Sequence, residues 1–158
     1  MLNSDMITPM IIHFICRGNA FRSRMAGAYL NSLELDGLKA ISSGTVAKQH
    51  SESNKANFLI TQSVLEEHGL KKFTKAHWDQ LNKKRLLEGD LTVFLNKNVE
   101  KECQKLFGLP DNYIVWDIPD FDEISPIPTT KAEIHVFTER TYSLIVSKIN
   151  NLSDYLLR

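Results

Sequence analysis

Apolar and polar positions along the chain form blocks that predict strands followed by helices. Short β-branched and aromatic runs predict strands over residues 10–16, 38–43, 91–96 and 113–117. Apolar residues at helical spacing predict helices over residues 22–35, 55–68, 77–87, 98–107 and 130–156. Such alternation favours parallel strands joined by right-handed crossovers. We therefore expect an α/β fold, a single three-layer domain with a four-stranded parallel sheet flanked by helices.

The first predicted strand leads directly into a short loop and a helix. Cys16 ends the strand, Gly18 and Asn19 lie in the loop, and Arg22 and Ser23 begin the helix. This order of elements directs backbone N–H groups and the positive end of the helix dipole at one point. We expect a phosphate-binding loop after the first strand, where the Arg22 guanidinium donates two hydrogen bonds to the oxygens of the anion.

Cys16 has the surroundings of a nucleophile. A thiol reacts as its thiolate, which a helix N-terminus and a nearby arginine favour. Ser23 can donate a hydrogen bond to the sulfur, and Asn19 tolerates a left-handed conformation that ties the loop together. The alternative is a buried strand cysteine followed by an arginine by accident. The strand before Cys16 and the helix after it argue against that alternative.

An acidic, proline-containing loop over residues 116–123 precedes the last predicted helix. A leaving oxygen needs a proton, which a carboxylic acid can supply. Asp117, Asp120 and Asp122 are the candidates. The alternative is a solvated acidic loop that caps the next helix. By position, the loop follows the last strand at the carboxyl edge of the sheet, where ligands bind in folds of this type.

The chain resembles the low-molecular-weight protein tyrosine phosphatases. Their signature, Cys-x-Gly-Asn-x-x-Arg-Ser followed by Met-Ala, is present as Cys16, Gly18, Asn19, Arg22, Ser23, Met25 and Ala26. A second element that carries weight lies at 118–121, weaker similarities lie at 42–45 and 69–90, and the resemblance covers roughly residues 10–156. Thioredoxin-coupled arsenate reductases share this fold and much of the loop.

The resemblance implies a role for each matching residue. Cys16 is the expected nucleophile, Arg22 binds the phosphoryl group, and Asp120 is the expected general acid, since it follows Ile-Pro as the family's acid does. The expected phosphate-binding residues are Arg17, Gly18, Asn19, Ala20, Phe21, Arg22 and Ser23. The expected loop-supporting residues are Asn19, Ser23, Ser42 and His77.

The acid loop departs from the family at one position. Phe121 stands where the family usually has proline, and the loss of that φ restraint leaves the acid less firmly held. Phe121 is instead a candidate aromatic wall for the substrate. No second aromatic follows Thr45 until Phe58, so the other wall is expected to be missing.

Composition narrows the possible functions. The chain has 158 residues and no formal net charge, which gives no indication of a nucleic-acid surface. Its cysteines, Cys16 and Cys103, suggest neither a disulfide framework nor a metal site, and no cofactor or metal is expected. We find no signal peptide or membrane-spanning run, so we expect a cytoplasmic protein without a membrane partner. Residues 1–9 form an expected N-terminal extension and residues 10–158 the domain.

The predicted function is metal-independent hydrolysis of phosphomonoesters through a cysteinyl-phosphate intermediate. The expected partner is a phosphorylated protein carrying phosphotyrosine, or a small phosphomonoester. One alternative is a non-catalytic module that binds phosphate or phosphopeptides. A second is an arsenate reductase, which needs resolving cysteines that the middle of this chain does not offer.

Overall fold

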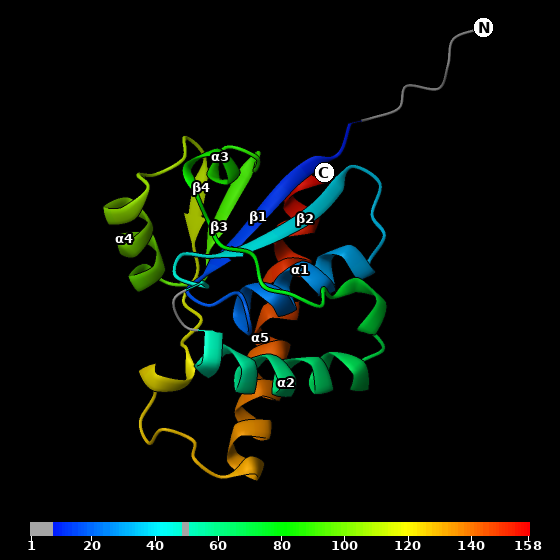
Figure 1. Ribbon diagram of the computed structural model, residues 1–158. Helices are drawn as coiled ribbons and strands as arrows, with labels where there is room; N and C mark the ends of the chain where they lie inside the picture. Colours follow the sequence, from blue (N-terminus) through cyan, green and yellow to red (C-terminus); the bar gives the residue numbers. More distant parts are fainter. Residues whose placement is uncertain (1–7, 49–50) are drawn as a thin grey trace, which may run out of the picture.

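A four-stranded parallel sheet forms the centre of the molecule. The computed structural model describes residues 8–48 and 51–158; most of the predicted N-terminal extension therefore lies outside the described residues. The strands, in the spatial order β2-β1-β3-β4, are β2 Leu38–Gly44, β1 Met10–Cys16, β3 Leu91–Phe94 and β4 Tyr113–Val115 (Figure 1). All neighbouring pairs are parallel. The predicted α/β fold is confirmed.

Helices cover both faces of this sheet (Figure 1). One face carries α1 Arg22–Ser32 and α5 Lys131–Leu156, and α2 Ser51–Glu67 packs on both of these helices. The other face carries α3 Lys83–Leu86 and α4 Lys97–Leu106. Two short 3-10 helices, η1 Lys71–Phe73 and η2 Phe121–Glu123, complete the described elements. The arrangement is the expected three-layer sandwich.

The side-chain alternation of β1 divides the core between the two faces. Ile12, Phe14 and Cys16 point into the large cluster that includes α1 and α5. Ile15 points into the smaller cluster beside α4, with Val99 and Cys103. Successive strand residues face opposite sides of a sheet, so both faces of this central strand can be buried.

The predicted helix over residues 77–87 is wrong for its first half. Only Lys83–Leu86 is helical, and Asn82 caps it by accepting a hydrogen bond from the Arg85 N–H at 2.8 Å. The residues before it run alongside the end of β2. Gly44 donates to the Asp79 carbonyl and accepts from the Leu81 N–H, both at 2.8 Å. These tertiary hydrogen bonds outweigh the local helical pattern.

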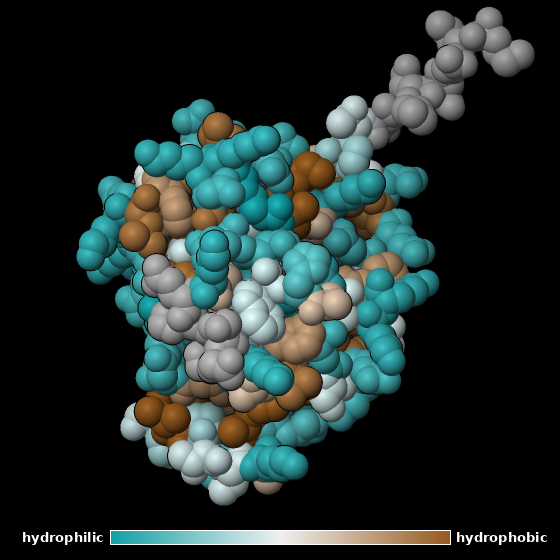
Figure 2. All heavy atoms as spheres, in the orientation of Figure 1, coloured by the Kyte–Doolittle hydropathy of each residue, from teal (hydrophilic) through white to brown (hydrophobic). Residues whose placement is uncertain are grey.

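No helix within the described part of the chain is long and apolar enough to cross a membrane. Figure 2 shows a face that is mostly hydrophilic, with hydrophobic side chains gathered at the end of the molecule where α5 begins. Ile127 and Val136 are exposed at that end. Much of the surface of a folded protein is apolar, so we assign these side chains no function.

Candidate active site

Cys16 lies at the carboxyl end of β1, and hydrogen-bond donors approach its sulfur from the loop that follows. The Asn19 N–H donates to Cys16 Sγ at 3.3 Å, and Ser23 Oγ lies 2.9 Å from the same sulfur. Ser23 Oγ also accepts a hydrogen bond from the Asn19 side chain at 2.8 Å. Its own proton can point at the sulfur or at the Ser43 carbonyl, which lies farther away at 3.4 Å. These are the contacts that a thiolate accepts.

Asn19 holds the loop in shape. It is fully buried and adopts a left-handed conformation, with φ of 56°. Its Nδ2 donates to Ser42 Oγ at 3.0 Å as well as to Ser23, and its Oδ1 accepts from the Asp79 N–H at 2.8 Å. The structure thus brings the predicted supporting residues Asn19, Ser23 and Ser42 together beside Cys16.

Gly44 lets the end of β2 lie directly against the loop. A Cβ atom at Gly44 would stand 2.4 Å from the Arg17 carbonyl oxygen and 2.8 Å from the Asn19 nitrogen. Backbone hydrogen bonds fix this contact, because the Thr45 N–H donates to the Cys16 carbonyl at 3.0 Å. The Ser42-Ser43-Gly44-Thr45 segment therefore packs on the loop as a second layer.

Arg22 begins α1 and is 1% exposed. Its Nη1 donates to the Ile118 carbonyl at 2.8 Å, and its Nη2 lies 3.3 Å from Asp120 Oδ2. Glu123 Oε1 lies 3.7 Å from Nη1. No side chain of the described residues caps this helix at Phe21, so the orphan N–H groups of the first turn remain available to an anion.

The acid loop presents Asp120 to Arg22. Asp120 caps η2 in a capping box: its Oδ1 accepts from the Phe121 N–H at 2.9 Å, while its own N–H donates to Glu123 Oε1 at 2.8 Å. Its side chain is 24% exposed, which keeps it in contact with solvent. Asp117 and Asp122, the rival carboxylates, are exposed. Of the three, Asp120 is the one paired with the buried guanidinium.

Glu123 anchors the acid loop, and sequence reasoning missed it. Burial alone raises its pKa, but hydrogen bonds from the Asp120 backbone and the Asn98 side chain, together with the charge of Arg22, outweigh burial and lower that pKa. Asn96 also donates to Glu123, at 2.9 Å. The carboxylate is thus an ionised anchor for the loop. Its only sequence signal is its spacing of three residues from Asp120, the capping-box pattern.

Phe121 is half-buried within an aromatic cluster. Its ring centroid lies 4.3 Å from that of Phe21, in the phosphate-binding loop, and 5.0 Å from that of Phe137, in α5. These contacts and the capping box supply restraint where proline is missing. Phe58, the next aromatic after Thr45, packs against Trp78 at 5.8 Å, with the Arg24 guanidinium over its ring.

Arg17 and Glu102 form an ion pair beside the loop. Arg17 Nε lies 3.2 Å from Glu102 Oε1, and the Thr45 hydroxyl donates to the same oxygen. Burial alone lowers the pKa of Arg17, but the hydrogen bond and charge of Glu102, aided by Asp122 and Asp120, raise it overall. The Arg17 side chain is 42% exposed, so the pair remains open to solvent.

The structure does not bring the His77 side chain to the loop. That side chain is 71% exposed and pairs with Asp79 Oδ1 at 3.2 Å. In this region the main chain of Asp79, rather than the His77 side chain, bonds to the loop through Asn19. The imidazole is displaced because residues 77–82 are extended rather than helical, so only the His77 carbonyl faces inward and accepts from Arg24.

Arg24 is a second buried arginine that sequence reasoning missed. It is 2% exposed and donates to the carbonyls of Asn19 at 3.1 Å, Lys75 at 2.7 Å and His77. Burial lowers its pKa to about 10, while the charges of the Cys16 thiolate and Asp79 oppose that lowering. A charged residue on the inward face of α1 is the only sequence signal for this role.

Asp120, Asp122 and Glu123 place carboxylate oxygens within 4.8 Å of one another, the spacing of a cation site. Two of the three already face Arg22. A guanidinium at this distance repels a second cation, and these residues fit an anion-binding site better than a metal centre.

The sequence matches the model of the low molecular weight phosphotyrosine protein phosphatase family over residues 11–152. The chain belongs to this family and is a phosphatase of that class. No curated protein matches the chain at a significant level.

Solved structures of similar fold align over nearly the whole chain. The YwlE arginine phosphatase from Geobacillus stearothermophilus is 21% identical with a TM-score of 0.67, covering 94% of this chain and 96% of its own. Vibrio vulnificus Wzb, solved with benzylphosphonate, is 18% identical with a TM-score of 0.69, covering 94% and 99%. A low molecular weight phosphotyrosine phosphatase from Vibrio cholerae O395 is 16% identical with a TM-score of 0.68, covering 94% and 97%. At these identities the likeness shows the fold.

Proposed function

We propose that this phosphatase hydrolyses phosphomonoesters through a cysteinyl-phosphate intermediate. The observation that carries the proposal is the placement of Cys16 Sγ inside a ring of donors from Asn19 and Ser23, at the same loop as the buried Arg22 and its partner Asp120. These are a nucleophile, an anion clamp and a proton donor within one site.

In the first step, Cys16 Sγ attacks phosphorus as the bond to the leaving oxygen breaks. Arg22 and the first-turn N–H groups of α1 hold the phosphoryl oxygens and offset their charge. Asp120, in its protonated form, gives its proton to the leaving oxygen. The products of this step are an alcohol or phenol and phosphorylated Cys16.

In the second step, water attacks the phosphorus of the intermediate. Asp120, now a carboxylate, accepts a proton from that water, and the sulfur leaves as a thiolate. Inorganic phosphate is released and the resting enzyme is restored. The hydrogen bonds from Ser23 and Asn19 stabilise the departing sulfur as they do the attacking one.

The substrate we propose is a phosphorylated protein carrying phosphotyrosine, or a small phosphomonoester. Phe121 is the candidate wall for a flat leaving group, since it is half-buried and follows the proposed acid directly. The solved relatives include both an arginine phosphatase and a phosphotyrosine phosphatase, so phosphoarginine belongs in the substrate panel.

The geometry supports arsenate reduction less well. Cys103, the other cysteine, lies in the core cluster on the opposite face of the sheet from Cys16. Burial raises the pKa of the Cys103 thiol to about 11, and the charge of Glu102 adds to the rise. A buried thiol of this kind is a poor resolving nucleophile.

The test is hydrolysis of p-nitrophenyl phosphate in the presence of EDTA. We expect turnover by the wild type and by the matched control Cys103→Ser, and none by Cys16→Ser. Turnover by Cys16→Ser would overturn the mechanism. A folded wild type that binds vanadate without hydrolysing any phosphate ester would instead support a binding module.

A further inference from the structure

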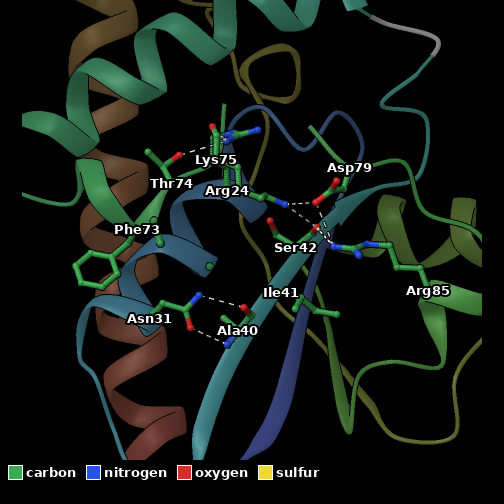
Figure 3. Close-up of a pocket in the computed structure, with 12 residues that line it drawn as sticks. Arg24, Asn31, Ala40, Ile41, Ser42, Phe73, Thr74, Lys75, Asp79 and Arg85 are labelled. Carbon is green, nitrogen blue, oxygen red and sulfur yellow. Dashed lines mark hydrogen bonds and ion pairs between the residues drawn. The ribbon is translucent and has the colours of Figure 1, made fainter. Parts of the chain in front are cut away.

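A cavity of about 140 Å³ lies at the edge of the sheet between α1, β2 and residues 73–79. We call it the edge cavity. The residues of its lining that matter here are Arg24, Asn31, Ser42, Lys75, Asp79 and Arg85. Figure 3 shows Lys75, Asp79 and Arg85 meeting near Ser42, while the Asn31 side chain pairs with the backbone of Ala40 lower in the same wall.

The lining of the edge cavity has an excess of positive charge. It contains three basic side chains, those of Arg24, Lys75 and Arg85, and a single carboxylate, that of Asp79. Lys75 pairs with Asp79 Oδ2, and Arg85 Nη2 lies 3.2 Å from the same oxygen. Arg85 Nη1 also lies 3.6 Å from Glu88 Oε2, which is outside the cavity lining. One carboxylate oxygen is thus shared by two cations, while Arg24 has only neutral partners among the described residues.

The three basic side chains of the edge cavity are also partly or fully buried. The side chains of Lys75 and Arg85 are 33% and 22% exposed, and Arg24 is almost fully buried. Burial lowers the pKa of Lys75; Asp79 opposes this effect, and the charges of Arg24 and Arg85 add to it. Like charges held together in a partly dry cavity repel one another, and an anion between them relieves that repulsion.

We propose that the edge cavity is a second anion site, which binds inorganic phosphate or a similar small oxyanion independently of the catalytic loop. Charge-assisted hydrogen bonds from Lys75 and Arg85 would hold the oxygens, and the nearby charge of Arg24 would add to the attraction. Asp79 competes with the anion for the first two. The anion must therefore displace Asp79 from these side chains, and its affinity for the cavity is modest for that reason.

The edge cavity adjoins the residues that shape the catalytic loop. Arg24 donates to the Asn19 carbonyl, and the Asp79 N–H donates to the Asn19 side chain. Arg85 also donates to the Ser42 carbonyl at 3.0 Å, and the hydroxyl of Ser42 accepts from Asn19. Phosphate, the product of the proposed reaction, would thus have two separate sites that lie on either side of Asn19.

The test is a phosphate titration of the ¹⁵N-labelled protein followed by amide chemical shifts. Amides of Ala28 and Ile41 report on the edge cavity, and amides of Ala20 and Phe21 report on the catalytic loop. We expect two dissociation constants in the wild type. Lys75→Gln should weaken the cavity constant about tenfold and leave the loop constant within about twofold.

Two further variants make the result specific. Asp79→Asn keeps the backbone amide but removes the competing charge, so it should tighten the cavity constant. Lys105→Gln makes the same charge change on an exposed position of α4, across the sheet, and should alter neither constant. The proposal is overturned if the cavity amides follow the loop amides with one shared constant in every variant, or if Lys75→Gln and Lys105→Gln behave alike.

Discussion

Arg22 and Arg24 lie two residues apart in α1 and are almost equally buried, but their surroundings differ. Arg22 faces the carboxylates of Asp120 and Glu123 on the acid loop. Arg24 faces backbone carbonyls, which join the catalytic loop to residues 74–77. A guanidinium paired with half-exposed carboxylates can exchange them for phosphoryl oxygens. A guanidinium bound to carbonyls, such as that of Arg24, holds chain segments together. The roles of the two arginines therefore follow from their partners and not from their burial.

The largest expected effect is on catalysis by Arg22→Ala. This change removes the clamp on the phosphoryl oxygens, so kcat/KM should fall by about 10³-fold or more. Its free energy of unfolding should change less than that of an Arg24 variant, because a single carbonyl, that of Ile118, loses a donor, and the Asp120 and Glu123 carboxylates that also lose one are partly exposed to water. Steady-state kinetics and urea unfolding measure the two effects. Near-normal kinetics in a folded Arg22→Ala protein would remove this arginine from the mechanism.

Asp120→Asn tests the role of the carboxylate that faces Arg22. The amide keeps the shape of the cap but cannot donate the proton, so kcat should fall by about 10²-fold or more for esters with poor leaving groups. Aryl phosphates whose leaving groups are good should be affected less. Asp117→Asn and Asp122→Asn are the matched controls, since both carboxylates are exposed. A larger loss in either control would identify a different acid.

Arg24→Met tests whether the hydrogen bonds of Arg24 to backbone carbonyls stabilise the protein. Three carbonyls would lose a charged donor, and the free energy of unfolding should fall by about 3 kcal/mol in urea titrations. The control is Arg140→Met, an exposed arginine in α5, which should change it by less than about 0.5 kcal/mol. If Arg24→Met is as stable as the control, the carbonyl network does not hold the loop.

The effect that is smallest at neutral pH concerns His13, a buried residue of β1. His13 is buried and its Nε2 contacts Ser43 Oγ at 2.8 Å. Burial, aided by the charges of Arg85 and Lys75, lowers its pKa from 6.5 to about 3. Below pH 6.5, therefore, His13 binds a proton in the unfolded chain but not in the folded protein. The stability that His13 contributes is complete above that pH and is lost as the pH falls towards 3.

His13→Gln removes this titration. Between pH 6.5 and 3 the wild type should lose up to about 1.4 kcal/mol per pH unit more than the variant does. His135→Gln, at an exposed histidine of α5, should follow the wild type. Equal pH slopes in all three proteins would show that His13 takes up its proton as easily in the folded state.

The fold was largely predictable, because the strands and most helices depend on local patterns. Cys16, Gly18 and Arg22 could be proposed from the sequence because their spacing within one strand–loop–helix unit is a local property of the chain. Arg24, Asp79 and Glu123 were missed, since their partners come from segments distant in sequence. His77 was misplaced for the same reason: the extended run before α3 depends on backbone bonds to Gly44.

The central claim is that phosphate is carried on Cys16 during turnover. Rapid acid quenching of the wild type with p-nitrophenyl phosphate, followed by peptide mass spectrometry, tests it directly. We predict a phosphorylated peptide that contains Cys16 and whose label is absent when Cys16→Ala is treated alike, with Cys103 unmodified in both. Turnover accompanied by no phosphorylated peptide, or by a label on another residue, would contradict it.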